Sequence, residues 1–337
     1  MSTDPGSSAA GTRPAPPGVE RLPMAAAHGH SAPLAFWPAA HHAADHAAHH
    51  AAAETGRDAT TEAGRDAATG TALDAAPELA TAPAALVLPA LGVPAGAYRR
   101  LAEALAQLGT PTGVAEWRGG GASPVRAARG VDWGYLDLLQ HEVQGGIAAL
   151  RTHLHGRPVV VIGHSLGGHL GLMARAPAVP GLAGVITVAS GTPTLRFFSP
   201  RLRALLRVVL AAHRVSGPLL GYFPGHLVGF GGRQSRTLIS EWALLARLGR
   251  FEIKGLNLLE PQSAAARGIP VHSLCLPHDT YAPHAATAHL LQLAGVGEDR
   301  IERFEGPGPL GHFDWLKEPQ ALATRMQAVM GAWGRVA

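Results

Sequence analysis

The chain has 337 residues, 47% of them hydrophobic, which is enough for one large domain with a substantial core plus an extension. Only 15% of the residues are charged, and arginine carries almost all of the basic excess behind the net charge of +4, because Lys254 and Lys317 are the only lysines. No stretch reaches the roughly 18 apolar residues that span a bilayer, no secretory signal is visible, and the single cysteine, Cys275, excludes an intrachain disulfide, so we expect a cytoplasmic protein.

Residues 1–82 differ in composition from the rest of the chain. They carry four basic and nine acidic residues, whereas the remainder carries 24 basic and 15 acidic residues. Their hydrophobic content beyond alanine is too low to offset the entropy of ordering, so we predict a disordered tail. Seven histidines lie between His28 and His50; a metal-binding tract is the alternative, but no metal-site spacing is present, and we predict no metal or cofactor. The basic remainder lacks interleaved aromatic residues, so we expect no nucleic-acid partner.

From residue 83 onward, short β-branched or apolar runs alternate with helical patterns. The runs that read as strands are residues 85–88, 112–117, 159–162, 184–189, 271–276 and 301–305. The segments that read as helices are residues 98–108, 135–153, 166–176 and 319–333. This alternation predicts an α/β fold with a mostly parallel, doubly wound sheet, whose sites lie at the carboxyl ends of the strands.

Between Ser190 and Val271 the alternation of strands and helices stops. This segment is too long for a structureless loop, so we predict a helical cap over residues 193–268, inserted between core parts 83–192 and 269–337. Its aromatic residues and glycines suggest a roof over an apolar pocket, and we assign Tyr222 and Phe223 to substrate binding; the alternative is that the aromatics form the core of the cap. The arginine-rich stretch that begins at Arg201 packs its apolar face on the core in this interpretation, with contact to a membrane surface as the alternative.

The most informative stretch of the chain surrounds Ser165. A four-residue β-branched run, residues 159–162, leads directly into the sequence Gly-His-Ser-Leu-Gly at residues 163–167. A serine held on a sharp turn between a buried strand and a helix needs small residues two positions away on either side. The amino end of the following helix would favour negative charge that develops near the serine. We therefore predict that Ser165 is a nucleophile, and that the adjacent His164 lies near the substrate.

A serine nucleophile needs a histidine base, and the base needs a carboxylate that orients it. Asp279 follows the predicted strand 271–276 and is the only carboxylate between that strand and Glu298. His312 lies on the loop between the last strand and the last helix, where the order serine, acid, histidine places the base. We assign Asp279 and His312 to these two roles.

An oxyanion hole requires two backbone N–H groups. The first is the N–H of Leu166, directly after the nucleophile. The second should come from the loop after the first ordered strand; we choose Val93, with Leu91 as the alternative, and assign Leu91 to substrate binding as well. A glycine turn without a catalytic role is the other interpretation of this loop.

These motifs resemble those of the serine-nucleophile α/β-hydrolase superfamily. More narrowly, the chain resembles a group of predicted bacterial hydrolases of unassigned substrate, which share the motifs found here at residues 91–94, 163–168, 221–225, 229–232 and 310–313. The resemblance extends over about residues 84–333. The antiparallel strands that open such folds are not readable in this sequence, and residues 70–79 are the best candidates for them.

The resemblance and the residues together predict an esterase that forms an acyl-enzyme on Ser165 and acts on a small apolar ester. Transfer of the acyl group to another acceptor is the nearest alternative, because the same acyl-enzyme serves both reactions. A non-catalytic binding protein that retains the fold is the alternative from another class, although a binding protein has no need of all three residues. The sequence does not define the acyl part, the alcohol part or the oligomeric state.

Overall fold

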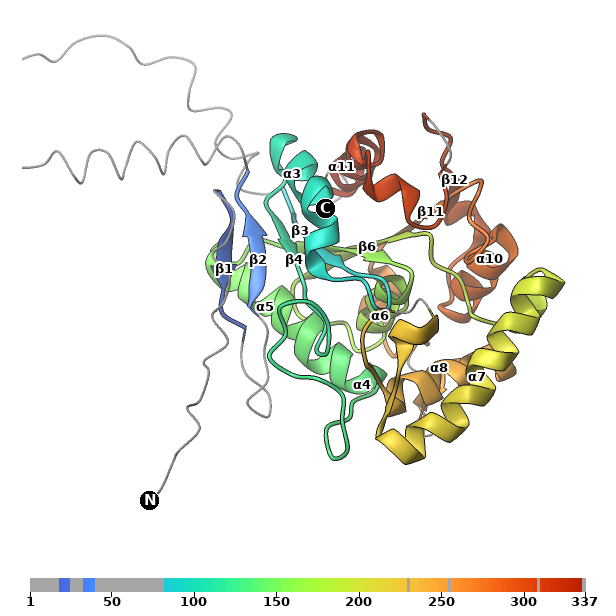
Figure 1. The fold of residues 1–337 in the computed structure, drawn as a ribbon. Coiled ribbons are helices and arrows are strands. Elements are labelled where there is room, and N and C mark those ends of the chain that lie inside the picture. The colour runs from blue at the N-terminus through green and yellow to red at the C-terminus, as the bar shows by residue number, and fades with distance from the viewer. Residues whose placement is uncertain are drawn as a thin grey trace, which may run out of the picture.

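The computed structural model describes residues 18–24, 33–39, 82–228, 231–253, 256–257, 259–307 and 310–334. Its central element is an eight-stranded sheet in the order β1-β2-β4-β3-β5-β6-β11-β12 (Figure 1). The strands are β1 (Glu20–Leu22), β2 (Leu34–Trp37), β3 (Ala84–Leu88), β4 (Thr112–Val114), β5 (Val159–His164), β6 (Leu182–Val188), β11 (Val271–Cys275) and β12 (Ile301–Arg303). All neighbours from β4 to β12 pair in parallel, which confirms the predicted mostly parallel sheet.

Two strands of this sheet come from the segment that the sequence analysis assigned to a disordered tail. β2 pairs antiparallel with β4 and β1 pairs antiparallel with β2, so both extend the sheet at one edge. Leu34 and Phe36 are almost completely buried there. The prediction that order begins near residue 83 is therefore wrong for residues 18–24 and 33–39. Residues 70–79, which we considered for the opening strands, and the histidines between His28 and His50 lie outside the described residues.

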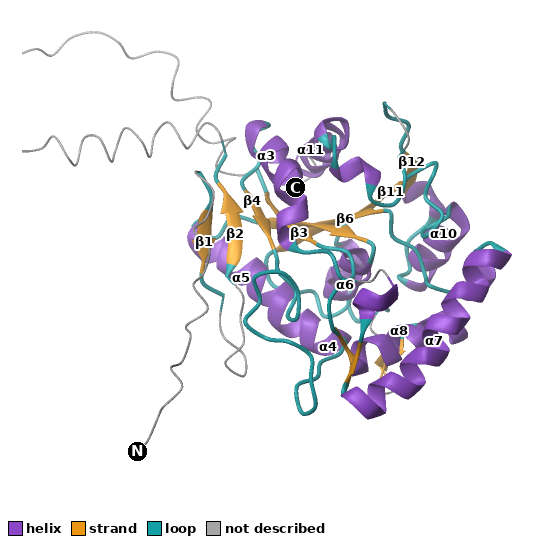
Figure 2. Cartoon of the chain, in the orientation of Figure 1, coloured by secondary structure: helices purple, strands orange, loops and turns teal. Residues whose placement is uncertain are grey.

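Helices cover both faces of the sheet (Figure 2). One face carries α3 (Arg99–Gln107) and α11 (Gln320–Gly334), and the other carries α4 (Tyr135–Asp137), a π-helical turn (Leu138–Val143), α5 (Gln144–His153), α6 (Leu166–Arg175) and α10 (His284–Leu293). The alternation within β5 divides the core between the two faces. Val159 and Val161 pack with α5 and α6, whereas Val160 and Ile162 pack with α3 and α11. A continuous apolar strand is therefore required here, because both of its faces are buried.

The segment between β6 and β11 adds two long helices, α7 (Pro200–Leu220) and α8 (Arg236–Leu248), which pack against each other (Figure 1). Short elements complete it: β7 (Tyr222–Phe223), β8 (Gln234–Ser235), β9 (Glu252–Ile253), β10 (Leu256–Asn257) and α9 (Ala264–Gly268). The start of α8 is bound to the loop before α4. The Asp132 carboxylate accepts hydrogen bonds from the Thr237 N–H and hydroxyl and from the Ser235 hydroxyl. These bonds hold the inserted segment in one position over the sheet.

None of the helices in the described ranges has the length and apolar character needed to cross a membrane.

Candidate active site

Ser165 lies at a sharp turn between β5 and α6. Its backbone has φ 54° and ψ −112°, a conformation that side-chain-bearing residues rarely adopt and that surrounding structure must enforce. The flanking glycines make the turn feasible. A Cβ on Gly163 would lie 2.3 Å from the Gly167 carbonyl oxygen, and a Cβ on Gly167 would lie 2.1 Å from the Leu88 carbonyl oxygen. The backbone segments at this turn are therefore too close together for side chains at residues 163 and 167.

The predicted oxyanion hole would take its two N–H groups from Leu166 and from the loop after β3. Leu166 is the first residue of α6, where helix N–H groups have no partner within the helix. The Val93 N–H donates to the Ala90 carbonyl at 3.2 Å within the turn, although Val93 lines the pocket, and this favours the alternative, Leu91, as the second donor. Leu91, the alternative, occupies the same turn, and none of the hydrogen bonds among the described residues uses its N–H.

Asp279 and His312 form a buried pair. Asp279 follows β11, His312 lies on the loop between β12 and α11, and the Asp279 Oδ2 is 2.8 Å from the His312 Nδ1. The other carboxylate oxygen accepts the N–H groups of Tyr281 at 2.8 Å and Ala282 at 2.9 Å. The side chains of Asp279 and His312 are 0% and 7% exposed. With both oxygens engaged, the carboxylate is held in one orientation and fixes the His312 tautomer that carries its proton on Nδ1.

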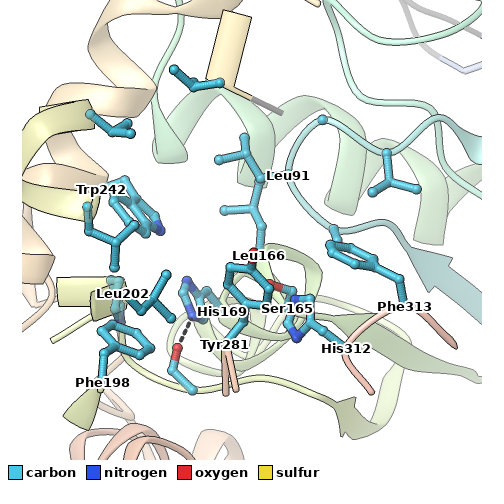
Figure 3. Close-up of a pocket in the computed structure, with 18 of the residues that line it drawn as sticks. Leu91, Ser165, Leu166, His169, Phe198, Leu202, Trp242, Tyr281, His312 and Phe313 are labelled. Carbon is cyan, nitrogen blue, oxygen red and sulfur yellow. Dashed lines mark hydrogen bonds between the residues drawn. The ribbon is translucent and has the colours of Figure 1, made fainter. Parts of the chain in front are cut away.

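Ser165 and His312 line one pocket with a volume of about 240 Å³ (Figure 3). Leu91, Val93 and Leu166 line it as well, so the predicted nucleophile, base and oxyanion N–H donors all belong to residues of the same cavity. Helix α7 contributes a wall, and the remaining lining comes from the loops after β3, β6, β11 and β12, from α6 and from the rest of the inserted segment. None of the described lining residues is Asp, Glu, Lys or Arg, and most are apolar: Pro193, Phe198, Leu202, Leu205, Leu206, Val209, Val228, Trp242, Tyr281 and Phe313.

The aromatic residues that we assigned to substrate binding do not line this pocket. Phe223 is 2% exposed and packs with Val209 and Ile239, in a small core between α7 and α8. Tyr222 lies under the guanidinium of Arg233, whose carbon is 4.6 Å from the ring centre. The alternative interpretation, an internal cap core, therefore applies to Phe223. Phe230 lies outside the described residues.

Two other aromatic residues of the predicted roof, Phe198 and Trp242, do line the pocket, together with Tyr281, which the sequence analysis did not consider. The available signal was their position in the inserted segment or directly after Asp279. Which of the aromatics faces the pocket depends on how α7 and α8 pack.

His164 does not line the pocket either, and it is 1% exposed. Its Nδ1 is 2.7 Å from the Tyr98 hydroxyl, which in turn accepts the Ala90 N–H at 2.8 Å. Its ring lies 4.9 Å from the His312 ring and 5.2 Å from that of Trp315, measured between centres. Burial, reinforced by the nearby His312, holds the pKa of His164 well below its ordinary value. A neutral His164 therefore links the oxyanion loop, through Tyr98, to the loop that carries His312.

His169 makes the free energy of unfolding depend on pH. Burial lowers the pKa of His169 from 6.5 to about 4, and its Nε2 donates to the Gly191 carbonyl at 2.9 Å (Figure 3). The unfolded chain takes up a proton near pH 6.5, whereas the folded chain does so only near pH 4. The neutral His169 therefore contributes about 3 kcal/mol to the free energy of unfolding. This contribution is fully present above pH 6.5 and is lost as the pH falls to about 4.

We expect His169→Gln to flatten this dependence. Urea unfolding of the parent, followed from neutral pH to about pH 4, should show a steeper loss of unfolding free energy than the same series on the variant. His278→Gln, at an exposed histidine next to Asp279, is the matched control and should retain the slope of the parent. Equal slopes for the parent and His169→Gln would show that His169 is not the group responsible.

Part of the chain matches a known protein family. A family model described as serine aminopeptidase, S33, matches residues 83–226, and no curated protein matches the chain. Among solved structures, the chain is similar to a monoacylglycerol lipase from Paleococcus ferrophilus, with 19% identity, a TM-score of 0.48 and coverage of 74% of this chain and 96% of that one. A thermophilic esterase from Thermogutta terrifontis has 14% identity, a TM-score of 0.48 and coverage of 94% and 99%.

The candidate site residues follow the strands of the sheet in a fixed order. A mostly parallel sheet carries a serine on a strained turn after β5, and a buried aspartate–histidine pair comes from later loops in the order of the sequence. The family model covers the part of the chain that includes this turn. Over residues 83–226 the chain is similar to the serine aminopeptidase, S33, family, and its sheet and serine turn have the arrangement of the α/β-hydrolase fold.

Proposed function

We propose that this chain is a serine hydrolase that cleaves a carboxylic ester with an apolar acyl or alcohol group. The observation that carries the proposal is the uncharged, mostly apolar pocket around Ser165 and His312. An enzyme that binds the free amino group of a peptide needs a carboxylate in its pocket, because a buried ammonium without a partner is strongly disfavoured. The absence of acidic residues from the described lining therefore favours an ester over a peptide.

In the first half of the proposed reaction, Ser165 Oγ attacks the ester carbonyl carbon while His312 Nε2 takes the serine proton. Asp279 stabilises the imidazolium that forms. The tetrahedral oxyanion accepts hydrogen bonds from the N–H groups of Leu166 and Leu91, residues that both line the pocket. The C–O bond then breaks, and the alcohol leaves with the proton from His312, so that the acyl group remains on Ser165.

In the second half, a water molecule attacks the acyl carbonyl and gives its proton to His312. The second tetrahedral intermediate uses the same two N–H groups. Its collapse breaks the bond to Ser165 Oγ, which takes back the proton from His312, and the carboxylic acid is released. Transfer to another alcohol would follow the same steps with that alcohol in place of water.

A panel of p-nitrophenyl acetate, butyrate and octanoate tests the proposal with a matched pair of phenylalanine variants. Phe198 lines the pocket, so Phe198→Ala should lower kcat/KM on the octanoate by a factor equivalent to about 1–3 kcal/mol of transition-state binding. The value for the acetate should change little. Phe223 lies in the cap core, so Phe223→Ala should reduce the free energy of unfolding by about 3–5 kcal/mol and leave the chain-length profile unchanged. Absence of hydrolysis of every ester by the folded parent would contradict the proposal.

A further inference from the structure

Helix α7 presents apolar side chains on its outward face as well as on its inward face. Leu206, Val209 and Leu210 are buried against the rest of the molecule. A second apolar row, which we call the α7 stripe, consists of Leu205, Val208, Ala212, Val215 and Leu219. Its spacing of three and four residues places it along one side of the helix. The large side chains of the stripe are 56–66% exposed, where a helix on the surface of a globular protein normally carries polar residues.

The charged residues of the chain segment that contains the α7 stripe all have one sign. Residues 193–240 contain seven arginines and no aspartate or glutamate. Arg201, Arg207 and Arg214 are exposed on α7 itself, and none of them forms an ion pair with a carboxylate in the described part of the chain. An exposed apolar row with unpaired arginines beside it is the pattern of a helix that lies on an anionic surface.

The α7 stripe reaches the rim of the pocket that holds Ser165. Leu205 belongs both to the stripe and to the pocket lining. Val228, Tyr281 and Phe313 also line the pocket and are 40–48% exposed, so the rim is apolar on the side of the inserted segment and on the side of the core. A surface that covered the stripe would therefore also lie next to the entrance.

We propose that the α7 stripe docks this chain on an anionic lipid surface, with the pocket rim facing the lipid. The apolar side chains would enter the boundary between headgroups and acyl chains, and the arginines would extend their charged ends to the phosphates. An apolar ester dissolved in the lipid would then enter the pocket without crossing water. This last step rests on the proposed function, whereas the docking itself does not.

A second copy of this chain is the other occupant to consider, and charge argues against it. A symmetric contact through α7 would bring two copies of the same arginine-rich helix together. Like charges across an interface disfavour association, whereas phosphate groups of a lipid surface neutralise them.

The test is binding of the full chain to sedimented vesicles. We expect binding to vesicles of equimolar phosphatidylglycerol and phosphatidylcholine, weaker binding in high salt, and little binding to phosphatidylcholine alone. Combined Val208→Asp and Val215→Asp should reduce binding at least about tenfold, because charge replaces the apolar contact. Arg207→Gln and Arg214→Gln should each reduce it about fivefold. Neither pair of residues lines the pocket, so hydrolysis of soluble short esters should stay at the level of the parent.

Leu108→Asp is the matched control, because Leu108 is a 38% exposed leucine at the end of α3 and lies outside the α7 stripe. It should bind vesicles as the parent does. The proposal is overturned if the parent does not bind the anionic vesicles, or if the double aspartate variant binds as well as the parent. A parent dimer that dissociates in the double variant, without vesicle binding, would overturn it in favour of a second copy. Vesicle binding without hydrolysis of soluble esters would contradict the proposed function and leave the docking supported.

Discussion

Replacement of Ser165 by alanine should reduce ester hydrolysis by at least about a thousandfold, because the change removes the atom that forms the acyl-enzyme. The fold should be retained, since the turn is built by Gly163 and Gly167 rather than by the serine hydroxyl. Initial rates on p-nitrophenyl butyrate, together with circular dichroism, measure both effects. Labelling by a fluorophosphonate probe should disappear with the activity, because the probe reacts with an activated serine.

Ser190→Ala is the matched control for this experiment. Ser190 is a buried serine close to the same turn, and its hydroxyl donates to the Val188 carbonyl at 2.9 Å rather than facing the pocket. Its removal should cost about 1 kcal/mol of stability and leave labelling intact. Labelling that survives in Ser165→Ala and is lost in Ser190→Ala would reverse the assignment. A residual rate in Ser165→Ala above about a thousandth of the parent rate would also contradict it.

Asp279→Asn should lower kcat by about ten-thousandfold through the tautomer of His312. The backbone N–H groups of Tyr281 and Ala282 require an acceptor at Oδ1, so they orient the new amide with its NH₂ group toward His312. That NH₂ group donates to Nδ1, and the imidazole proton then lies on Nε2, where it prevents removal of the serine proton. KM and the melting temperature should change little, because the shape of the side chain is conserved.

Asp314→Asn is the control. Asp314 lies two residues after His312, and its exposed carboxylate pairs with Lys317. It should retain the parent kcat. If Asp279→Asn loses less than about tenfold, another group orients the base and the assignment of Asp279 is wrong. A large loss in both variants would indicate a general effect of charge on the loop rather than a specific role for Asp279.

The sequence by itself predicted the features of this protein that depend on short stretches of chain. The β-branched run before Ser165 and the glycines around it require a buried strand and a tight turn, and both requirements are met within a few residues. The chain order of Ser165, Asp279 and His312 could be read in the same way, because each follows a strand whose carboxyl end meets the same edge of the sheet.

The opening strands could not be read from the sequence, because they depend on partners that are distant along the chain. β1 and β2 have only three and four residues, and they are flanked by stretches rich in alanine and proline. What stabilises them is pairing with β4 and burial of Leu34 and Phe36. Composition averaged over 82 residues obscured two short segments that do bury apolar surface.

Only the tertiary structure decided which backbone N–H groups and which aromatic side chains lie toward the pocket. The N–H of Val93 is engaged because the turn closes onto Ala90, a property of backbone direction that residue type does not encode. Phe223 and Phe198 are the same residue type in the same inserted segment, yet one packs between two helices and the other lines the pocket. A local pattern determines the turn that holds the nucleophile, whereas the packing of α7 and α8 over the sheet determines which side chains meet the substrate.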